Sequence, residues 1–496
     1  MKLFLRILCS LVAGGLLGAV LFCITLMLCP GMSIFGVRYI GFLQEQQIST
    51  ELLKGNLSGN VVIEANELNV EVCFSATEAG VVTYKQSFMG FTTSKMGETF
   101  FSCEEKNGVN TISFNDPKSI IFGVNRMYNG IKIVLPQTLE SVSVNCEKSD
   151  VTFTGKRVVA QAVSVNSLGT VNFDTAIHAQ NVSVQNAKVN FNNTISNNAV
   201  VTINTKKSIN VAVDNNANFN IITNNSTVKM ASCGELNVTI KNGAVKMRKG
   251  AEVFGDANIS TNGANIVLGK IYGTANVSSL FANVSMEYAK TAKISNSKGS
   301  TKVENAEIVN IVSESGSVEV LKCSTHTKVQ TTTGSVTLGD TKQENKTGFV
   351  NNVSVSTNKG KIKAFGVIGE RCTLDSKWGA IIVQDCNVGR LKIGAENGKV
   401  NANNIISENT QIVSNSTINV GFLDIVGDVK IYGGRRAVNV SVPEDKDFKC
   451  DISTGQKPCE IQIKDVVVSS VNFSNQTENS TYSLKIVTNQ GRVKVA

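Results

Sequence analysis

A short motif recurs along most of this chain at a nearly constant interval, and this repeat restricts the possible folds more than any other feature. In most copies, a polar or glycine-containing turn is followed by a small or charged residue, a Val or Ile, one polar residue and a second apolar residue. Six copies are separated by 17, 18, 26, 19 and 19 residues and begin at Gly299, Gly316, Gly334, Gly360, Gly379 and Gly398. Six earlier copies are separated by 18, 21, 18, 17 and 20 residues and begin at Gly169, Ala187, Ser208, Ser226, Gly243 and Gly263. A period of about 18–20 residues with alternating apolar positions indicates a β-solenoid, in which each coil buries its apolar face against the next.

The composition agrees with this interpretation. The chain has 54 Asn and 41 Gly but only 5 Pro. Proline would remove hydrogen-bond donors from the sheets, whereas Gly and Asn accept the positive-φ corners between strands. Asn residues at equivalent positions of successive coils can also stack as amide ladders. We therefore predict an all-β fold, a parallel β-solenoid of about 15–17 coils, with outward rows of Ser, Thr, Asn and Lys. The 26-residue interval contains the polar stretch 341–348, which we expect to form a loop.

The N-terminus carries a candidate membrane span. Residues 7–28 contain no charged side chain, and about 20 apolar residues suffice to cross a bilayer as a helix. Lys2 and Arg6 precede this stretch and the next basic residue is Arg38. The positive-inside rule then predicts a signal anchor with residues 1–6 in the cytoplasm and a C-terminal ectodomain that is extracellular or lumenal. The alternative is a cleaved signal peptide, which usually has an apolar core of about 7–15 residues and a small-residue cleavage site.

The remaining chain divides by its sequence pattern. Residues 29–59 are predicted to form a membrane-proximal stalk, and residues 60–136, with longer β-rich runs, an N-terminal cap. Residues 137–436 are assigned to the solenoid repeats, and residues 437–496 to the C-terminal coils and a second cap. Caps are expected because the terminal coil of a solenoid otherwise exposes an unpaired strand edge.

Several segments resemble a known family. They are Ile131-Lys-Ile-Val-Leu-Pro136, Ser141-Val-Ser-Val, Asp150-Val-Thr-Phe, Val440-Ser-Val-Pro443, Asp451-Ile-Ser-Thr-Gly455 and Ile486-Val-Thr-Asn-Gln-Gly-Arg-Val-Lys-Val495. Their rhythm is similar to the opening and closing strands of the bacterial domains named putative adhesins, over about residues 61–495. The resemblance implies a parallel β-solenoid at a cell surface with an adhesive role. It supplies no catalytic residue.

Twelve cysteines are present: Cys9, Cys23 and Cys29 lie in or beside the candidate span, and the other nine follow it. An extracellular or lumenal location would permit disulfides, and the pairs nearest in sequence are Cys372 with Cys386 and Cys450 with Cys459. The alternative is that these thiols point inward and pack as small apolar groups. The chain has no Cys-x-x-Cys motif, so a zinc site is not predicted.

Sixteen Asn-x-Ser/Thr sequons mark possible N-glycosylation sites in a eukaryotic secretory pathway, whereas elsewhere they would mainly serve turns. They are Asn56, Asn181, Asn192, Asn224, Asn225, Asn237, Asn258, Asn276, Asn283, Asn345, Asn352, Asn415, Asn439, Asn472, Asn475 and Asn479.

Catalytic signatures are weak in this sequence. It has two His and 14 Asp, without a phosphate-binding or dinucleotide-binding motif. Asp424 and Asp428 are the most conspicuous carboxylate pair, but four residues along a strand separate them by about 13 Å, which is far for a glycosidase pair. We therefore predict no catalytic residue, no cofactor and no metal site.

The net charge of +9 is spread along the sequence, with dense basic spots at 246–249 and 435–436, and aromatic residues are not interleaved with them. Nucleic-acid binding is therefore not predicted. The favoured function is a non-catalytic, membrane-anchored adhesin-like or structural ectodomain on the cell surface, which binds glycans or surface proteins through repetitive polar sheet faces. The alternative is a carbohydrate-active β-helix enzyme, a polysaccharide lyase or hydrolase, which would need acidic and basic side chains converging on one face.

Overall fold

The computed structural model describes residues 2–29, 32–48, 57, 59–92, 101–114, 120–339, 349–446, 448–455, 458–475, 480 and 482–496. The chain forms two compact units, residues 1–220 and 221–496. The expected loop at 341–348 lies outside the described residues.

Unit 1 begins with a helix and continues as strands. Its elements are α1 (Lys2–Leu28), β1 (Ser33–Ile34), β2 (Val37–Ile48), β3 (Asn60–Ala65), β4 (Val70–Ser75), β5 (Val81–Thr92), β6 (Phe101–Lys106), β7 (Val109–Phe114), β8 (Ile120–Pro136), β9 (Ser141–Cys146), β10 (Val151–Gly155), β11 (Arg157–Ser167), β12 (Thr170–Phe173), β13 (Ala176–Gln185), β14 (Lys188–Phe191), β15 (Val200–Thr205) and β16 (Ile209–Val211). Strand β17 (Asn218–Thr223) spans the limit between the units.

Unit 2 contains the longer strands, many of which pass around a corner of the coil. They are β18 (Ser226–Met230), β19 (Leu236–Met247), β20 (Glu252–Val253), β21 (Ala257–Phe281), β22 (Val284–Lys298), β23 (Thr301–Ser315), β24 (Val318–Thr331), β25 (Val336–Leu338), β26 (Phe349–Thr357), β27 (Ile362–Ser376), β28 (Ile381–Ala395), β29 (Val400–Ser414), β30 (Ile418–Gly433), β31 (Val438–Ser441), β32 (Phe448–Ser453), β33 (Cys459–Ile463), β34 (Val466–Ser470), β35 (Asn472–Asn475), β36 (Tyr482–Thr488) and β37 (Val493–Val495).

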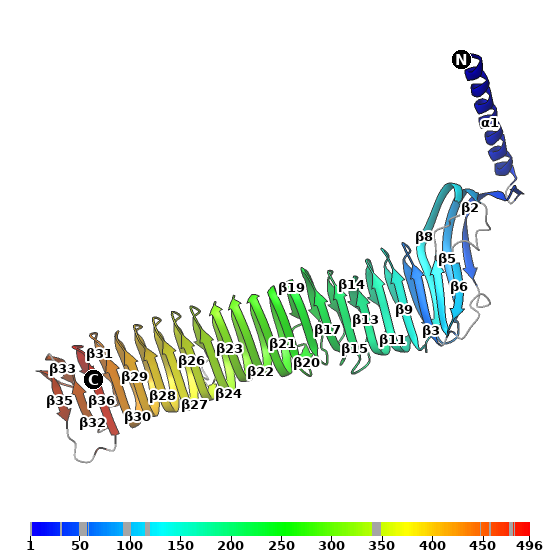
Figure 1. Cartoon of the computed structure of the whole chain (residues 1–496). Helices are drawn as coiled ribbons and strands as arrows, with labels where there is room; N and C mark the ends of the chain where they lie inside the picture. The colour runs from blue at the N-terminus through cyan, green and yellow to red at the C-terminus, as the bar shows by residue number, and fades with distance from the viewer. Residues whose placement is uncertain are drawn as a thin grey trace. The chain divides into compact units, whose positions relative to one another are not determined.

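Successive coils pair in parallel and in register, as Figure 1 shows within each unit. In unit 1, Val163 on β11 lies beside Val182 on β13, and in unit 2, Val318 on β24 lies beside Val336 on β25. The prediction of an all-β parallel solenoid is confirmed, with about 15 coils. The period-2 alternation also holds, since inward Val and Ile are buried along each strand while their neighbours face outward.

The core of unit 1 contains a column of aromatic rings at one inward position. The ring centroids of Phe74 and Phe153 are 6.2 Å apart, those of Phe153 and Phe173 are 4.9 Å apart, and those of Phe173 and Phe191 are 4.6 Å apart, with nearly parallel planes. The column follows from the repeat, because residues at equivalent positions of adjacent coils necessarily lie beside one another.

The glycines that open the repeats in unit 2 form a column of their own. A Cβ atom at Gly360 would lie 1.8 Å from the carbonyl oxygen of Gly334, and one at Gly379 would lie 1.8 Å from that of Gly360. Of the six glycines that begin the repeats between Gly299 and Gly398, Gly299 and Gly316 have positive φ angles. At the other four positions, glycine is required because one coil approaches the next too closely for a side chain, and not because the backbone is left-handed. The expectation that glycine serves positive-φ corners is therefore wrong at these four positions.

The N-terminal end of the parallel stack is built out of chain order. Strand β3 lies between β7 and β9, parallel to both, and β4 lies in the same way between β8 and β10. The outer sides of β7 and β8 are covered by the antiparallel strands β6 and β5. Residues 60–136 thus supply two coils of the parallel stack, β3 with β4 and β7 with β8, and the antiparallel strands β5 and β6 that cover its edge.

The C-terminal end of unit 2 repeats this device. Strand β36 lies between β30 and β32, and β37 lies between β31 and β33, all in parallel. The antiparallel strands β35 and β34 then cover β32 and β33. The coil formed by β36 and β37 therefore lies between β30 and β31 on one side and β32 and β33 on the other, although all four of these strands precede it in sequence.

The N-terminal helix is longer than expected, because α1 includes Lys2 and Arg6 as well as residues 7–28. It is long and apolar enough to cross a membrane, as either an anchor or a signal sequence would be. The segment 29–59 contains β1 and β2, and β2 is antiparallel to β5, so hydrogen bonds tie part of the expected stalk to residues 81–92.

Candidate binding surface

One sheet of unit 2 presents three straight outward rows of side chains. We name it the lateral sheet, and it consists of residues 236–240 of β19, 257–261 and 274–279 of β21, 291–296 of β22, 308–313 of β23, 326–331 of β24, 352–357 of β26, 371–376 of β27, 390–395 of β28, 409–414 of β29, 428–433 of β30 and 484–488 of β36. Neighbouring coils in such a sheet are about 4.8 Å apart, so each row repeats its chemistry at short, regular intervals.

The middle row carries amides, hydroxyls and ammonium groups. Its residues are Asn237, Asn258, Asn276, Lys293, Asn310, Lys328, Ser354, Thr373, Lys392, Gln411, Lys430 and Lys485. This row has no carboxylate, and it matches the expected outward rows of Ser, Thr, Asn and Lys. The fold thus collects lysines that are two or three coils apart in the sequence into one line.

The two flanking rows are mixed. The first row contains Thr274, Thr291, Ile308, His326, Asn352, Arg371, Arg390, Asn409 and Asp428, and the last row contains Thr239, Ser260, Ser278, Ser295, Val312, Gln330, Ser356, Asp375, Gly394, Val413, Tyr432 and Val487. Only one carboxylate occurs in each of these rows. The face as a whole is therefore basic and rich in hydrogen-bonding groups.

Asparagine ladders hold parts of the outward rows in place. Asn276 donates to Asn258 at 2.7 Å and Asn258 donates to Asn237 at 2.8 Å, side chain to side chain. On another outward row, Asn439 donates to Asn419, which donates to Asn401, both at 2.8 Å. These ladders fix the orientation of the side-chain amides along each row.

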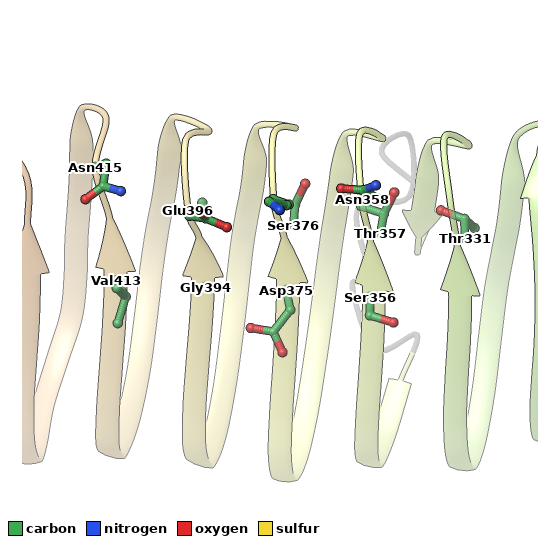
Figure 2. Close-up of a pocket in the computed structure, with 12 residues that line it drawn as sticks. Thr331, Ser356, Thr357, Asn358, Asp375, Ser376, Gly394, Glu396, Val413 and Asn415 are labelled. Carbon is green, nitrogen blue, oxygen red and sulfur yellow. The ribbon is translucent and has the colours of Figure 1, made fainter.

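Two shallow hollows lie on the lateral sheet. One, of about 580 Å³, extends over the Asn237–Asn258–Asn276 ladder and reaches Lys293 and Asn310. The other, of about 540 Å³, lies along the last row and the adjoining corner, where Figure 2 shows Asp375 and Glu396 on neighbouring coils. Lys377 and Asn358 also line this second hollow.

Asp375 occupies an unusual position in the second hollow. The next residue along its row is Gly394, where a Cβ atom would lie 2.3 Å from Oδ1 of Asp375. The missing side chain therefore leaves room for the carboxylate to lean along the sheet. Burial raises the pKa of the Asp375 carboxyl above its ordinary value, and the charge of Lys392 opposes this rise.

We expect Asp375→Asn to raise the thermal unfolding midpoint at pH 7. Because the folded-state pKa of Asp375 is raised, folding favours the protonated acid. That contribution is complete below the ordinary pKa and is lost as the pH rises through the raised value. An amide removes the cost of the buried charge at pH 7, so variant and wild type should differ there but coincide near pH 3, where the carboxyl is protonated in both folded and unfolded chains. Calorimetry at the two pH values measures this. A lower midpoint for Asp375→Asn at pH 7 would show instead that the carboxylate is stabilising.

The carboxylate pair identified from the sequence does not form a joint site. Asp424 makes an ion pair with Lys446 at 3.0 Å, whereas Asp428 accepts a hydrogen bond from the hydroxyl of Ser483. Each carboxylate thus has its own structural partner. The carboxylates that do line one hollow, Asp375 and Glu396, were not singled out from the sequence, because only the fold places them on adjacent coils.

Cys372 and Cys386 are both buried near one corner of adjacent coils. In register, Cys372 lies beside Leu391 and Cys386 beside Val367, and the two thiols share a hydrogen bond. This contact and burial raise the pKa of the Cys372 thiol well above its ordinary value. In the structure, Cys372 and Cys386 are free thiols packed in the interior. A disulfide between them stays a prediction.

The second predicted cysteine pair is divided between different strands. Cys450 is buried on β32, and burial raises the pKa of its thiol to about 12. Cys459 is half-buried on β33. Their pairing also stays a prediction.

The sequons fall into three structural groups. Asn56, Asn345 and Asn479 lie outside the described residues. Seven donate side-chain hydrogen bonds to a residue on a neighbouring coil or accept one from it: Asn192, Asn225, Asn237, Asn258, Asn276, Asn283 and Asn439. The remaining described sequons are Asn181, Asn224, Asn352, Asn415, Asn472 and Asn475, and Asn181, Asn415, Asn472 and Asn475 are exposed. Glycosylation itself stays a prediction.

Three aromatic side chains form a surface cluster that was not predicted from the sequence. The rings of Phe254 and Tyr272 stack at 6.3 Å, and the ring of Tyr288 follows at 6.1 Å. The hydroxyl of Tyr272 donates to Glu252 at 2.9 Å, and this bond raises the pKa of the tyrosine. The signal in the sequence was the spacing of these aromatics at roughly one coil period.

The comparisons with known proteins are limited. No protein family matches the chain, and no curated protein matches it. Three solved structures are similar in part. A "putative cell adhesion protein" from Clostridium sporogenes is 10% identical, with 55% of this chain and 99% of that chain covered and a TM-score of 0.20. A "putative adhesin" from Parabacteroides distasonis is 11% identical, with 65% and 97% covered and a TM-score of 0.17. A "putative adhesin" from Parabacteroides merdae is 10% identical, with 92% and 97% covered and a TM-score of 0.15. TM-scores this low carry no conclusion about this chain, and the family resemblance inferred from the sequence stays a prediction.

Proposed function

We propose that this protein is an adhesin-like, non-catalytic β-solenoid that binds glycans or surface proteins through the outward face of its lateral sheet. The observation that supports this most is the middle row, in which Asn, Lys, Ser, Thr and Gln side chains repeat from β19 to β36 without a carboxylate. A row of this kind offers many equivalent polar contacts to an extended or repetitive partner. Each contact is weak, but many on one surface add up by multivalency.

The proposal includes a single-pass location in a membrane. Helix α1 would serve as the anchor, with its N-terminus in the cytoplasm and the solenoid on the extracellular or lumenal side. The basic residues Lys2 and Arg6 at one end of α1 support this orientation. In a eukaryotic secretory pathway, exposed sequons such as Asn181 and Asn415 would carry glycans.

The test is to display the full chain at high and low density in lipid nanodiscs on beads and to measure binding to cells and extracellular matrix. We expect binding that rises steeply with density, because single contacts are weak. On intact cells, a tag after Ala496 should be accessible to antibody and a tag at Met1 should not. Equal binding by empty nanodiscs would refute the adhesive role, and the reverse tag accessibility would refute the orientation.

One observation favours a second candidate function, a carbohydrate-active enzyme. Asp375 and Glu396 line the same hollow, and the raised pKa of Asp375 is what a general acid needs. Incubation of the full chain with acidic and neutral polysaccharides distinguishes the two functions. Release of cleaved sugar that is abolished in Asp375→Asn would establish the enzyme, whereas binding without product supports the adhesin.

A further inference from the structure

The middle row of the lateral sheet has a distinctive charge. Lys293, Lys328, Lys392, Lys430 and Lys485 are all exposed, and within the described part of the chain none of them has a carboxylate at ion-pair distance. Exposed lysines elsewhere do have such partners, for example Lys148 with Glu67 at 3.1 Å and Lys132 with Glu71 at 3.3 Å. The row therefore retains its positive charge for a partner outside the chain.

The flanking first row adds to this charge. Arg371 and Arg390 lie side by side on adjacent coils and are exposed, next to Thr373 and Lys392 of the middle row. The acidic residues on the three rows are Asp375 and Asp428, and Asp428 is held by Ser483. Seven basic residues against two acidic ones make this face strongly cationic.

We infer that the lateral sheet binds a linear acidic polysaccharide, whose carboxylate or sulfate groups contact the lysines of the middle row. This inference rests on the proposed adhesive function and names its ligand class. Along the row, lysines recur every two or three coils from Lys293 to Lys430, or about 10–14 Å, with amides and hydroxyls between them. An extended sugar chain presents acidic groups at regular intervals with hydroxyls between them, and so matches this alternation. The shallow hollow over the Asn237–Asn258–Asn276 ladder continues the same line at its N-terminal end.

Other anionic partners fit this face less well. Single-stranded nucleic acids need aromatic platforms for their bases, and Tyr432 is the only Phe, Tyr or Trp on the three rows as described. An anionic membrane would favour apolar side chains that insert beside the cations, whereas the middle row is entirely polar.

The test uses the full chain in nanodiscs of zwitterionic lipid and compares two variants with equal charge loss. The first is Lys328→Gln/Lys392→Gln/Lys430→Gln, which neutralises the middle row. The matched control is Lys322→Gln/Lys363→Gln/Lys494→Gln, whose lysines lie on other faces of the coils. Binding is measured to immobilised polygalacturonate, dextran sulfate, neutral dextran, anionic phospholipid vesicles and single-stranded DNA.

We expect the wild type to bind both acidic polysaccharides and not neutral dextran, with affinity falling steeply from about 50 to about 300 mM salt. The middle-row variant should lose about ten-fold or more in affinity, and the control less than about three-fold. Calorimetric midpoints of both variants should stay close to that of the wild type, since all six side chains are at the surface, with a small decrease in the middle-row variant because Lys392 no longer offsets the charge of Asp375.

Three results would overturn the inference. Equal losses in both variants would mean that net charge alone acts, and stronger binding to vesicles or DNA that is lost in the middle-row variant would assign another partner. Unchanged polysaccharide binding in the middle-row variant would remove the assigned site. In each of these cases density-dependent cell binding would still support the adhesive function, which fails separately if no surface is bound.

Discussion

Val336→Asp is expected to lower the free energy of unfolding of its part of the solenoid by about 4 kcal/mol. Val336 on β25 is completely buried and lies in register between Val318 and Ile362. An aspartate at this position would place a carboxylate among aliphatic side chains with no cation to pair with. Because each coil of a solenoid contacts mainly its neighbours, the effect should be local rather than a collapse of the whole array.

The matched control is the next residue, Thr337→Asp. Thr337 faces outward between Glu319 and Lys363, so its substitution should cost less than about 0.5 kcal/mol. Amide hydrogen exchange measured on β24, β25 and β27 reports the local stability of both variants. Similar loss of protection in the two variants would mean that the inward and outward positions of β25 have been assigned incorrectly.

The second large effect is expected in the aromatic column of unit 1. Phe173 is 1% exposed, and its ring lies between those of Phe153 and Phe191. Phe173→Ala should destabilise this region by about 3–5 kcal/mol, because the cavity is bounded by rings on adjacent coils that cannot move together without shifting the coils themselves.

Phe173→Leu serves as the control, because it retains most of the volume and should cost about 1–2 kcal/mol. Hydrogen exchange of β10, β12 and β14 measures both variants in the full chain. An equal loss for Leu and Ala would show that ring stacking, and not the filled volume, holds this column together.

The fold was predictable because its determinants are local and periodic. The interval between Gly299, Gly316 and Gly334 fixes the length of a coil, and the alternation of Val and polar residues fixes which side of each strand is buried. The order of strands at the two ends was not predictable. Nothing in the sequence of β3 indicates that it lies between β7 and β9, and nothing in the sequence of β36 indicates that it lies between β30 and β32. These pairings depend on strand edges that become available only after other strands have formed.

The candidate binding surface shows the same division. The alternation predicts the types of outward residue. It does not predict where the positive charge collects, because Lys328, Lys392 and Lys430 are 64 and 38 residues apart in the sequence. Only the registers of successive coils show that these residues share one row. The changing coil lengths, for example 26 residues between Gly334 and Gly360 against 17 between Gly299 and Gly316, prevent such a register from being counted along the sequence.

The insertion of β36 and β37 beneath β32 and β33 affects how this end can form during synthesis. As the chain leaves the ribosome, β32 to β35 appear before the coil on which they will rest, so they must wait unpaired or occupy the free edge of β30 and β31. When β36 and β37 emerge, they take that edge, and only then does the end of the stack close. A premature stop codon before residue 482 would therefore do more than shorten the array. It would leave the covering strands without a support and expose an open sheet edge to other chains, which makes such truncated products targets for aggregation and degradation.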